Sequence, residues 1–309
     1  MFIVVALGAC TSAPAPARGL AKSAYDVSGL IHAKGKYLGV SLDGVPGSTK
    51  PLETFASQVG KKANLVEYFV GWNEDFDMAG ARRVFEYGSL PFLNWEPYGK
   101  SLDDIAAGLS DYYIWNFATR VRELNLPIMM SFGHEMNGSW FPWGAQANSA
   151  ASFVRAWRRI HDTFHQVGAT NVIWTWSPNI VNPVLQITLA PLFPGDDYVD
   201  LVGLVGYYRR YDAHTFAGVY QPTIDLVRAF TRKPLMIAET GVEPGPGRPE
   251  QIADLLRGVV GRSDVIGFVY FDRSKQGKGE ADWRIAADAE SLAAFRGGVG
   301  SPVYGGLVR

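Results

Sequence analysis

Short apolar runs alternate with longer segments of helical periodicity along most of the chain. Apolar runs rich in β-branched and aromatic residues are typical of strands buried on both faces of a parallel sheet. Eight runs have this character: Tyr37–Leu42, Leu65–Val70, Leu90–Trp95, Pro127–Phe132, Val172–Trp176, Leu201–Tyr207, Leu235–Glu239 and Val265–Phe271. Because eight parallel strands that alternate with helices close into a barrel, the pattern predicts an α/β fold, a single (β/α)8 TIM barrel.

Amphipathic segments between these runs are long enough to form the covering helices, as at Leu102–Leu124, Ala150–Val167, Phe216–Phe230 and Pro249–Val260. Clusters of glycine and proline, such as "GVPGS" and "EPGPGRP", mark the joints between elements. A doubly wound open sheet is the alternative. It is disfavoured because no glycine-rich phosphate loop follows the first strand and no shift in composition marks a second domain. We therefore expect one barrel domain over residues 31–309.

Composition narrows the class of partner. The 309 residues carry a net charge of −1, and no block of Lys or Arg is longer than a pair, so the chain lacks the electrostatic footprint of a nucleic-acid-binding protein. Aromatic residues make up 13% of the chain. They suit a surface of flat apolar faces for a neutral ligand, although a large aromatic core would give the same percentage.

The first residues read as a targeting segment. Residues 1–9 form a short apolar leader that ends in "LGAC", which resembles a bacterial lipobox with Cys10 as the lipidated residue. A Ser/Ala/Pro-rich tether follows over residues 10–30. Since Cys10 is the single cysteine, the chain forms no internal disulfide. We predict a secreted or cell-surface lipoprotein, anchored to a membrane only through this lipid; a cleaved or vestigial leader is the alternative.

The C-terminal ends of barrel strands and the loops after them carry the reacting groups in this fold. The fourth and seventh predicted strands end at two carboxylates, Glu135 and Glu239. Aromatic residues follow the ends of most strands: Trp72, Trp95, Trp140, Trp143, Trp176, Tyr207 and Tyr270. We expect these rings to rim the mouth, where they would stack on the apolar C–H faces of sugar rings.

Paired carboxylates across a barrel mouth suit retaining glycoside hydrolysis, in which one acts as acid and then base while the other attacks the anomeric carbon. The acid needs a raised pKa, which burial beside Trp140 and Phe141 and the charge of Glu239 would produce. The nucleophile needs hydrogen-bond donors that keep it ionised. The pattern thus assigns acid/base chemistry to Glu135 and nucleophilic attack to Glu239.

The sequence "HEMNGSWFPWG" (His134–Gly144), together with "AETG" (Ala238–Gly241), resembles glycoside hydrolase family 26. The resemblance extends from about Tyr37 to Ala286. It implies a barrel with Glu135 as acid/base, Glu239 as nucleophile, and His134, Trp140 and Tyr207 lining the subsite in which the sugar is cleaved.

Three positions depart from the family pattern. Ser131 and Phe132 stand where an arginine usually precedes the His-Glu pair, and Val205 replaces an aspartate before Tyr207. On the last strand, Tyr270 and Phe271 stand where a tryptophan is common. Each departure leaves the reacting groups in place but affects the polarity of the subsites.

Other residues have competing interpretations. Glu96, at the end of the third strand, is the rival acid, and Asn179 and Arg209 are candidates for binding sugar hydroxyls. His161 and His165 have the spacing of metal ligands on a helix, but no acidic residue completes the set, so we interpret them as a solvated helix face.

We therefore predict a retaining endo-β-glycanase that acts on internal β-1,4 linkages of a mannan-type polysaccharide, as a monomer and without cofactor or metal. One alternative is a mixed-linkage β-1,3-1,4-glucan hydrolase of the same family, which the "WFPWG" ending favours. The other is a surface glycan-binding protein without catalytic activity.

Overall fold

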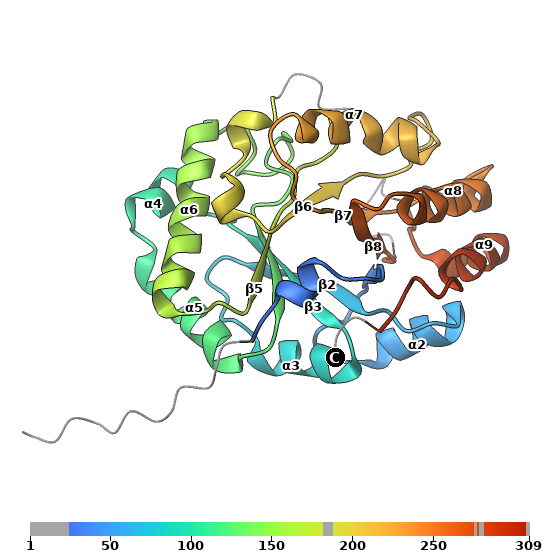
Figure 1. The fold of residues 1–309 in the computed structure, drawn as a ribbon, viewed down its shortest axis with the longest axis horizontal. Coiled ribbons are helices and arrows are strands. Elements are labelled where there is room, and N and C mark those ends of the chain that lie inside the picture. Colours follow the sequence, from blue (N-terminus) through green and yellow to red (C-terminus); the bar gives the residue numbers. More distant parts are fainter. Residues whose placement is uncertain (1–24, 182–187, 275–276, 278–280, 307–309) are drawn as a thin grey trace, which may run out of the picture.

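The barrel is closed and entirely parallel. The computed structural model describes residues 25–181, 188–274, 277 and 281–306. The strands of this part pair in chain order, and β8 pairs with β1 (Figure 1). They are β1 (Tyr37–Ser41), β2 (Leu65–Gly71), β3 (Leu90–Glu96), β4 (Ile128–Phe132), β5 (Val172–Trp176), β6 (Leu201–Val205), β7 (Leu235–Thr240) and β8 (Val265–Phe271). The predicted (β/α)8 barrel is confirmed, and each predicted strand is found at its place in the chain.

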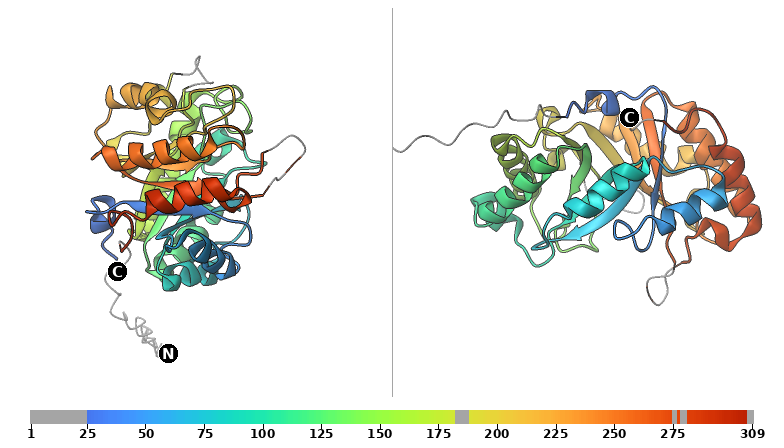
Figure 2. Two further views of the ribbon diagram at one scale, coloured as in Figure 1. Left: turned by 90° about the vertical axis from the view of Figure 1, so that its right-hand side faces the viewer. Right: turned by 90° about the horizontal axis from the view of Figure 1, so that it is seen from below.

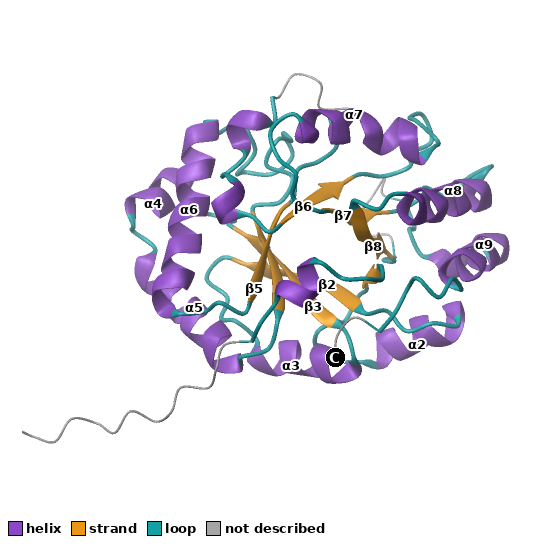
Figure 3. Cartoon of the chain, viewed as in Figure 1, coloured by secondary structure: helices purple, strands orange, loops and turns teal. Residues whose placement is uncertain are grey.

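Helices form a ring outside the strands (Figure 3). The main ones are α2 (Lys50–Val59), α3 (Met78–Tyr87), α4 (Leu102–Ala107), α5 (Asp111–Leu124), α6 (Ala150–Val167), α7 (Phe216–Arg228), α8 (Arg248–Gly261) and α9 (Ala289–Val299). The single helix predicted over Leu102–Leu124 is wrong in one respect, because Gly108 ends α4 with a φ of 92°, a left-handed conformation that glycine adopts readily. Helices α8 and α9 pack side by side (Figure 2).

Alternate residues of each strand face opposite sides of the barrel wall. The inward residues near the N-terminal end form an apolar plug, which includes Leu65, Phe92, Met129 and Ile173. The short helix α1 (Ser28–Ile31) closes this end, with Leu30 packed into the plug. The barrel is therefore filled at its N-terminal end, and a ligand can approach the interior only at the C-terminal mouth.

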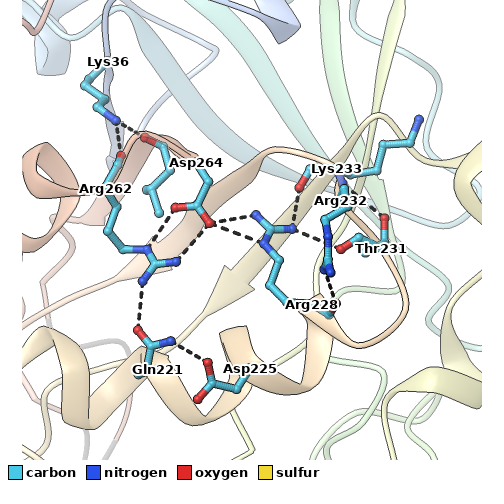
Figure 4. A network of polar contacts seen from close by, with 10 residues as sticks. Lys36, Gln221, Asp225, Arg228, Thr231, Arg232, Lys233, Arg262 and Asp264 are labelled. Carbon is cyan, nitrogen blue, oxygen red and sulfur yellow. Dashed lines mark hydrogen bonds and ion pairs between the residues drawn. The ribbon is translucent and has the colours of Figure 1, made fainter.

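An ionic network joins the segments that enter the last two strands (Figure 4). Asp264 accepts hydrogen bonds from Arg228 Nη2 and Arg262 Nε, both at 3.0 Å. Lys36, just before β1, donates to the carbonyl of Arg262 at 2.6 Å. Burial favours a higher pKa for Asp264, but the two guanidinium groups outweigh it and hold the pKa below its usual range. The network fastens α7, β1 and β8 together at the N-terminal end.

The predicted leader and most of the tether, including Cys10, lie outside the described residues. The described chain begins at Tyr25, whose backbone N–H donates to Asn125 Oδ1 at 3.1 Å and whose ring meets Phe85 edge-on at 6.5 Å. Within the described residues, each helix is too short or too polar to cross a membrane.

Candidate active site

Glu135 stands in a constrained loop at the end of β4. Gly133 and Glu135 both have left-handed backbones, with φ of 54° and 53°. A non-glycine residue in this conformation costs on the order of 1 kcal/mol and persists only where its surroundings hold it. Here the Glu135 N–H donates to the carbonyl of Ser177 at 2.6 Å, and the Glu135 carbonyl accepts from Gly138 N at 2.8 Å. The loop thus fixes the direction of the Glu135 side chain.

Both oxygens of the Glu135 carboxyl group accept a hydrogen bond. Trp140 Nε1 donates to Oε2 at 2.7 Å, and Asn179 Nδ2 donates to Oε1. Asn137 holds Asn179 in turn through two reciprocal bonds to its backbone, each 2.8 Å. Burial raises the pKa of Glu135, while Asn179, Trp140 and the charge of Arg209 oppose the shift. The net rise has the direction that a proton donor requires.

Glu239 lies on β7 at a register shift opposite Val205. The Tyr207 hydroxyl donates to Glu239 Oε1, and Gly206 N donates to the Glu239 carbonyl at 3.0 Å. Burial and the charge of Glu135 raise the pKa of Glu239 to about 8, although the Tyr207 hydroxyl and the charge of Arg273 oppose the rise. The charge of Glu135 acts on Glu239, and the charges of both act on Tyr207, so the two carboxylates lie in one mouth. Tyr207 is the donor that the sequence required near the second carboxylate.

Two predicted aromatic residues reach these carboxylates. Trp140 is 47% exposed beside Glu135, and Tyr207 is partly buried beside Glu239. The Tyr207 ring lies 4.8 Å from the ring of Trp283, and the Arg209 guanidinium lies over both rings at 5.6 and 5.8 Å. Each of the two carboxylates therefore has an aromatic residue beside it.

The expectation that other strand-end aromatics rim the mouth is wrong. Trp95, Trp176 and Tyr270 are fully buried, and Trp72 is 6% exposed. Their side chains lie on the outward faces of the strands and pack against the helical layer. Trp95 stacks on Phe117 of α5 at 4.2 Å, and Tyr270 meets Phe295 of α9 at 5.4 Å. Trp72 stacks on Trp95 at 4.7 Å, and Trp176 meets Phe193 and Phe230 at 5.3 and 6.1 Å.

Trp143 and His134 are buried residues that pack beneath the Glu135 loop and support it. Trp143 is 1% exposed, so the predicted sugar contact at this residue is wrong. Its ring stacks under Phe141 at 4.4 Å, and its Nε1 donates to the His134 carbonyl at 2.7 Å. His134 is buried, and burial lowers its pKa to about 3, so the imidazole is neutral. Its Nδ1 lacks a protein partner among the described residues, which leaves the predicted contact with substrate as a prediction.

The rival acid, Glu96, lies in the same mouth. It is the last residue of β3, and burial together with the charge of Glu74 raises its pKa to about 7. Its own charge raises the pKa of Glu239. The described hydrogen bonds to carboxylate oxygens favour Glu135 and Glu239 as the central pair, because both are held by donors from neighbouring loops.

Three residues of the mouth were not predicted from the sequence: Glu67, Arg273 and Trp283. Glu67 is 1% exposed in the middle of β2. A charged residue inside the apolar run "LVEYFV" was the signal that could have identified it, because buried charges require a specific partner. Trp283 comes 12 residues after the end of β8 in the sequence, and its approach to Tyr207 depends on the tertiary fold.

Of the two histidines on α6, His161 is half-buried and His165 is exposed. The His161 ring contacts Trp174 at 5.3 Å and Tyr198 at 5.0 Å. Within the described part of the chain, no cluster of three or more His, Cys, Asp or Glu side chains could hold a metal ion.

Comparison with known proteins adds the family. Residues 100–244 match the model of glycosyl hydrolase family 26. Endoglucanase H of Acetivibrio thermocellus is 30% identical over 277 residues, which cover 84% of this chain and 30% of that relative. Mannan endo-1,4-beta-mannosidase A and B of Caldalkalibacillus mannanilyticus is 35% identical over 115 residues, or 35% of this chain and 20% of the relative. The chain thus spans less than a third of the length of either relative.

Solved structures share the barrel. The catalytic domain of the GH26 endo-beta-1,4-mannanase of Bacillus sp. JAMB-750 superposes with a TM-score of 0.67 at 18% identity, covering 88% of both chains. A GH26 beta-mannanase of Bacteroides ovatus gives the same TM-score and identity, covering 89% of this chain and 91% of its own. At such identities the likeness is one of fold. The matched family model and the relative that aligns along most of the sequence show that the chain belongs to glycosyl hydrolase family 26.

Proposed function

We propose that the chain is a retaining endo-β-glycanase that hydrolyses a neutral polysaccharide. The observation that carries this proposal is the pair Glu135 and Glu239: two carboxyl groups at the ends of β4 and β7, both buried, each held by donors from the neighbouring loops. A general acid and a nucleophile must differ in protonation at one pH. Burial and the charge of a neighbouring carboxylate can separate their pKa values in this way.

The hydrogen bonds of the two carboxylates support the following reaction. Protonated Glu135 gives its proton to the glycosidic oxygen as that bond breaks, while ionised Glu239 attacks the anomeric carbon from the other side and forms a glycosyl ester. Glu135 then removes a proton from water, and the water oxygen replaces Glu239. Trp140 and Asn179 orient Glu135 for both steps. The Tyr207 hydroxyl and the Arg273 charge favour the ionised form of Glu239.

A β-1,4-mannan is our leading substrate. Seven of the relatives similar to this chain are named mannan endo-1,4-beta-mannosidases, and they align over 35 to 56% of it. A neutral glycan also suits the exposed Trp140 ring, which offers a flat apolar face to a pyranose.

A β-glucan is the second candidate. The relative that aligns over 84% of the chain is named an endoglucanase, and the "WFPWG" sequence favours mixed-linkage β-1,3-1,4-glucan. The two substrates differ in the orientation of the hydroxyl at C2, so residues that face this position decide between them.

The test is hydrolysis of mannan, glucomannan, lichenan and xylan by the wild type, Glu135→Ala, Glu239→Ala and the double variant. We expect new reducing ends from mannan or lichenan, reduced by at least about 1,000-fold in each variant. Proton NMR of the first products distinguishes retention from inversion at the anomeric carbon. Binding of a glycan without release above the double variant would instead establish the glycan-binding alternative.

We also propose a secreted or cell-surface location, with lipid attached at Cys10. The supporting feature is the lipobox-like "LGAC" at Leu7–Cys10. Expression in a bacterial host with and without globomycin tests it, with Cys10→Ser as the matched control. Processing that is blocked by globomycin and lost in Cys10→Ser is the expected result, and an unlipidated wild-type chain would contradict the proposal.

A further inference from the structure

The side chains that point into the barrel change from apolar to polar one layer above the apolar plug. In steps of two residues, the inward face of β1 to β5 continues from the plug to Ser41, Glu67, Asn94, Ser131 and Thr175. All five side chains are at most 3% exposed. We call these residues the polar floor. The floor lies between the plug and the strand ends that bear the two carboxylates, so it forms the base of the site.

Glu67 brings a carboxyl group into this floor. Its Oε1 accepts a hydrogen bond from Asn94 Nδ2 at 2.7 Å. Its Oε2 is buried and has no hydrogen-bond partner among the described residues. A buried carboxylate oxygen without a donor is costly, whereas a carboxylic acid supplies its own donor at that oxygen. The contacts therefore suit the neutral form of Glu67.

The charged and titratable groups that face Glu67 act on its pKa in both directions. They are Glu239 on β7, Arg273 after β8 and Tyr207 after β6. Burial and the charge of Glu239 hold the pKa of Glu67 well above its usual range, against the opposing effects of Asn94, Arg273 and Ser41. Arg273 Nε also donates to Ser41 Oγ at 3.1 Å.

The distribution of donors decides which of the two acids keeps a proton. Neighbouring carboxyl groups in one buried site rarely ionise together. Glu239 receives the Tyr207 hydroxyl, a donor that stabilises its charged form. Glu67 accepts from Asn94 at Oε1, and the Ser41 hydroxyl also favours its charged form, but its Oε2 atom has no hydrogen-bond partner among the described residues. The negative charge is therefore more stable on Glu239 and the proton on Glu67.

We propose that Glu67 is a positioning residue of the active site: it remains a neutral carboxylic acid, and its Oε2 hydroxyl is a hydrogen-bond donor in the floor beneath Glu239. Once Glu239 has ionised, the floor and the nucleophile then carry one negative charge rather than two. This role rests on the proposed hydrolase function, since it prepares Glu239 for attack. The neutral state itself can be measured without activity, which separates the two proposals.

The first experiment measures stability. Urea unfolding of the wild type and Glu67→Gln is followed at pH 4 and pH 7.5. Folded Glu67 keeps a proton that the unfolded chain releases above its ordinary pKa, so the advantage of the amide must grow with pH. We expect the ratio of the two unfolding constants to change at least tenfold between these pH values, and a ratio that does not change with pH overturns the neutral acid.

The same pair is compared in a Glu239→Gln background, where the titration of Glu239 is removed. A pH-dependent ratio that persists there assigns the proton to Glu67, and one that disappears overturns that assignment. Asp264→Asn is the matched control, because it makes the same carboxyl-to-amide change where two arginines lower the pKa. The stability of Asp264→Asn relative to the wild type must fall, not rise, as the pH increases.

The second experiment measures kcat/KM from pH 4 to 9 on whichever glycan is hydrolysed. Glu67→Gln keeps a neutral donor, so we expect activity within about threefold of the wild type and an unchanged acidic limb. Glu67→Leu removes the donor, and we expect kcat to fall at least tenfold with little change in KM. An acidic limb that moves down by a unit in Glu67→Gln would mean that Glu67 is charged, and full activity of Glu67→Leu would exclude a positioning role.

Discussion

At the N-terminal end of the barrel Asp264 lies between Arg228 and Arg262, whereas at the C-terminal end Glu239 lies within the field of Glu135 and Glu96. The first carboxylate has a lowered pKa and the second a raised one. Glu239 lies in β7 and Asp264 directly precedes β8, so both are held by the same barrel, and their neighbours produce the difference in pKa.

This contrast indicates what each end does. At the N-terminal end, opposite charges with good geometry connect α7, β1 and β8 and stabilise their packing. Like charges that are buried together destabilise the folded state, and they persist where reactivity requires perturbed pKa values. The ionic contacts at the N-terminal end therefore stabilise the fold, while the buried like charges at the mouth provide the perturbed pKa values that the chemistry needs.

The largest expected effect follows from Glu239→Gln. Turnover should fall at least about 1,000-fold, because the amide cannot attack the anomeric carbon. The folded pKa of about 8 lies above the unfolded value, so the wild type loses stability as the pH rises from about 4.5 towards 8. The amide avoids this loss, and we expect the variant to be more stable at pH 7 by on the order of 1 to 3 kcal/mol. Calorimetry at pH 4 and 7 checks it; equal stability at pH 7 would contradict it.

Tyr207→Phe removes the donor that favours ionised Glu239. The pKa of Glu239 should rise, so the acidic limb of the kcat/KM profile moves to higher pH, and the maximum falls about 10- to 100-fold. Tyr208→Phe is a matched control, since the Tyr208 hydroxyl faces Asp254 of α8 at 3.2 Å instead of the mouth. An unshifted acidic limb in Tyr207→Phe would show that the hydroxyl does not tune the nucleophile.

Trp140→Phe keeps an aromatic ring but removes the donor to Glu135 Oε2. Because this bond lowers the pKa of Glu135, the basic limb should move to higher pH, with kcat reduced roughly three- to tenfold. Trp176→Phe is the comparison on the outward face of the wall. It should lower the melting temperature and leave both KM and the pH profile unchanged, and a change in KM for Trp176→Phe would return this ring to the binding surface.

The smallest effect is expected at the other end of the barrel. Asp264→Asn should destabilise the protein by about 1 kcal/mol at pH 7, a modest amount because the carboxylate is partly screened by solvent. The lowered pKa means that this contribution is present above about pH 4 and is lost as the pH falls further. Activity well below the melting temperature should stay within twofold of the wild type.

The sequence predicted the barrel and the two carboxylates for a physical reason. Parallel strands buried on both faces appear as apolar runs, and the runs from Tyr37 to Phe271 were found with ends displaced by no more than two residues. The strand ends of a barrel meet at one mouth, so Glu135 and Glu239 could be assigned to it from their positions alone.

The facing direction of each side chain depended on the tertiary structure. Since both sides of a barrel wall are buried, an apolar run does not reveal which residues point inward, and Trp95, Trp176 and Tyr270 were assigned to the mouth although they pack outward. Glu67 could be assigned to the barrel interior only because it lies two residues after Leu65 in β2, on the same face of the strand.

Contacts between distant loops were equally beyond the sequence. The hydrogen bond from Asn179 to Glu135 and the approach of Trp283 to Tyr207 join segments that come together only when the sheet closes. The sequence by itself determined the fold and which carboxylates lie at the mouth, because strand length and position are local properties. Closure of the barrel decided which neighbours surround them and hence their protonation, because pKa values depend on burial and charge in three dimensions.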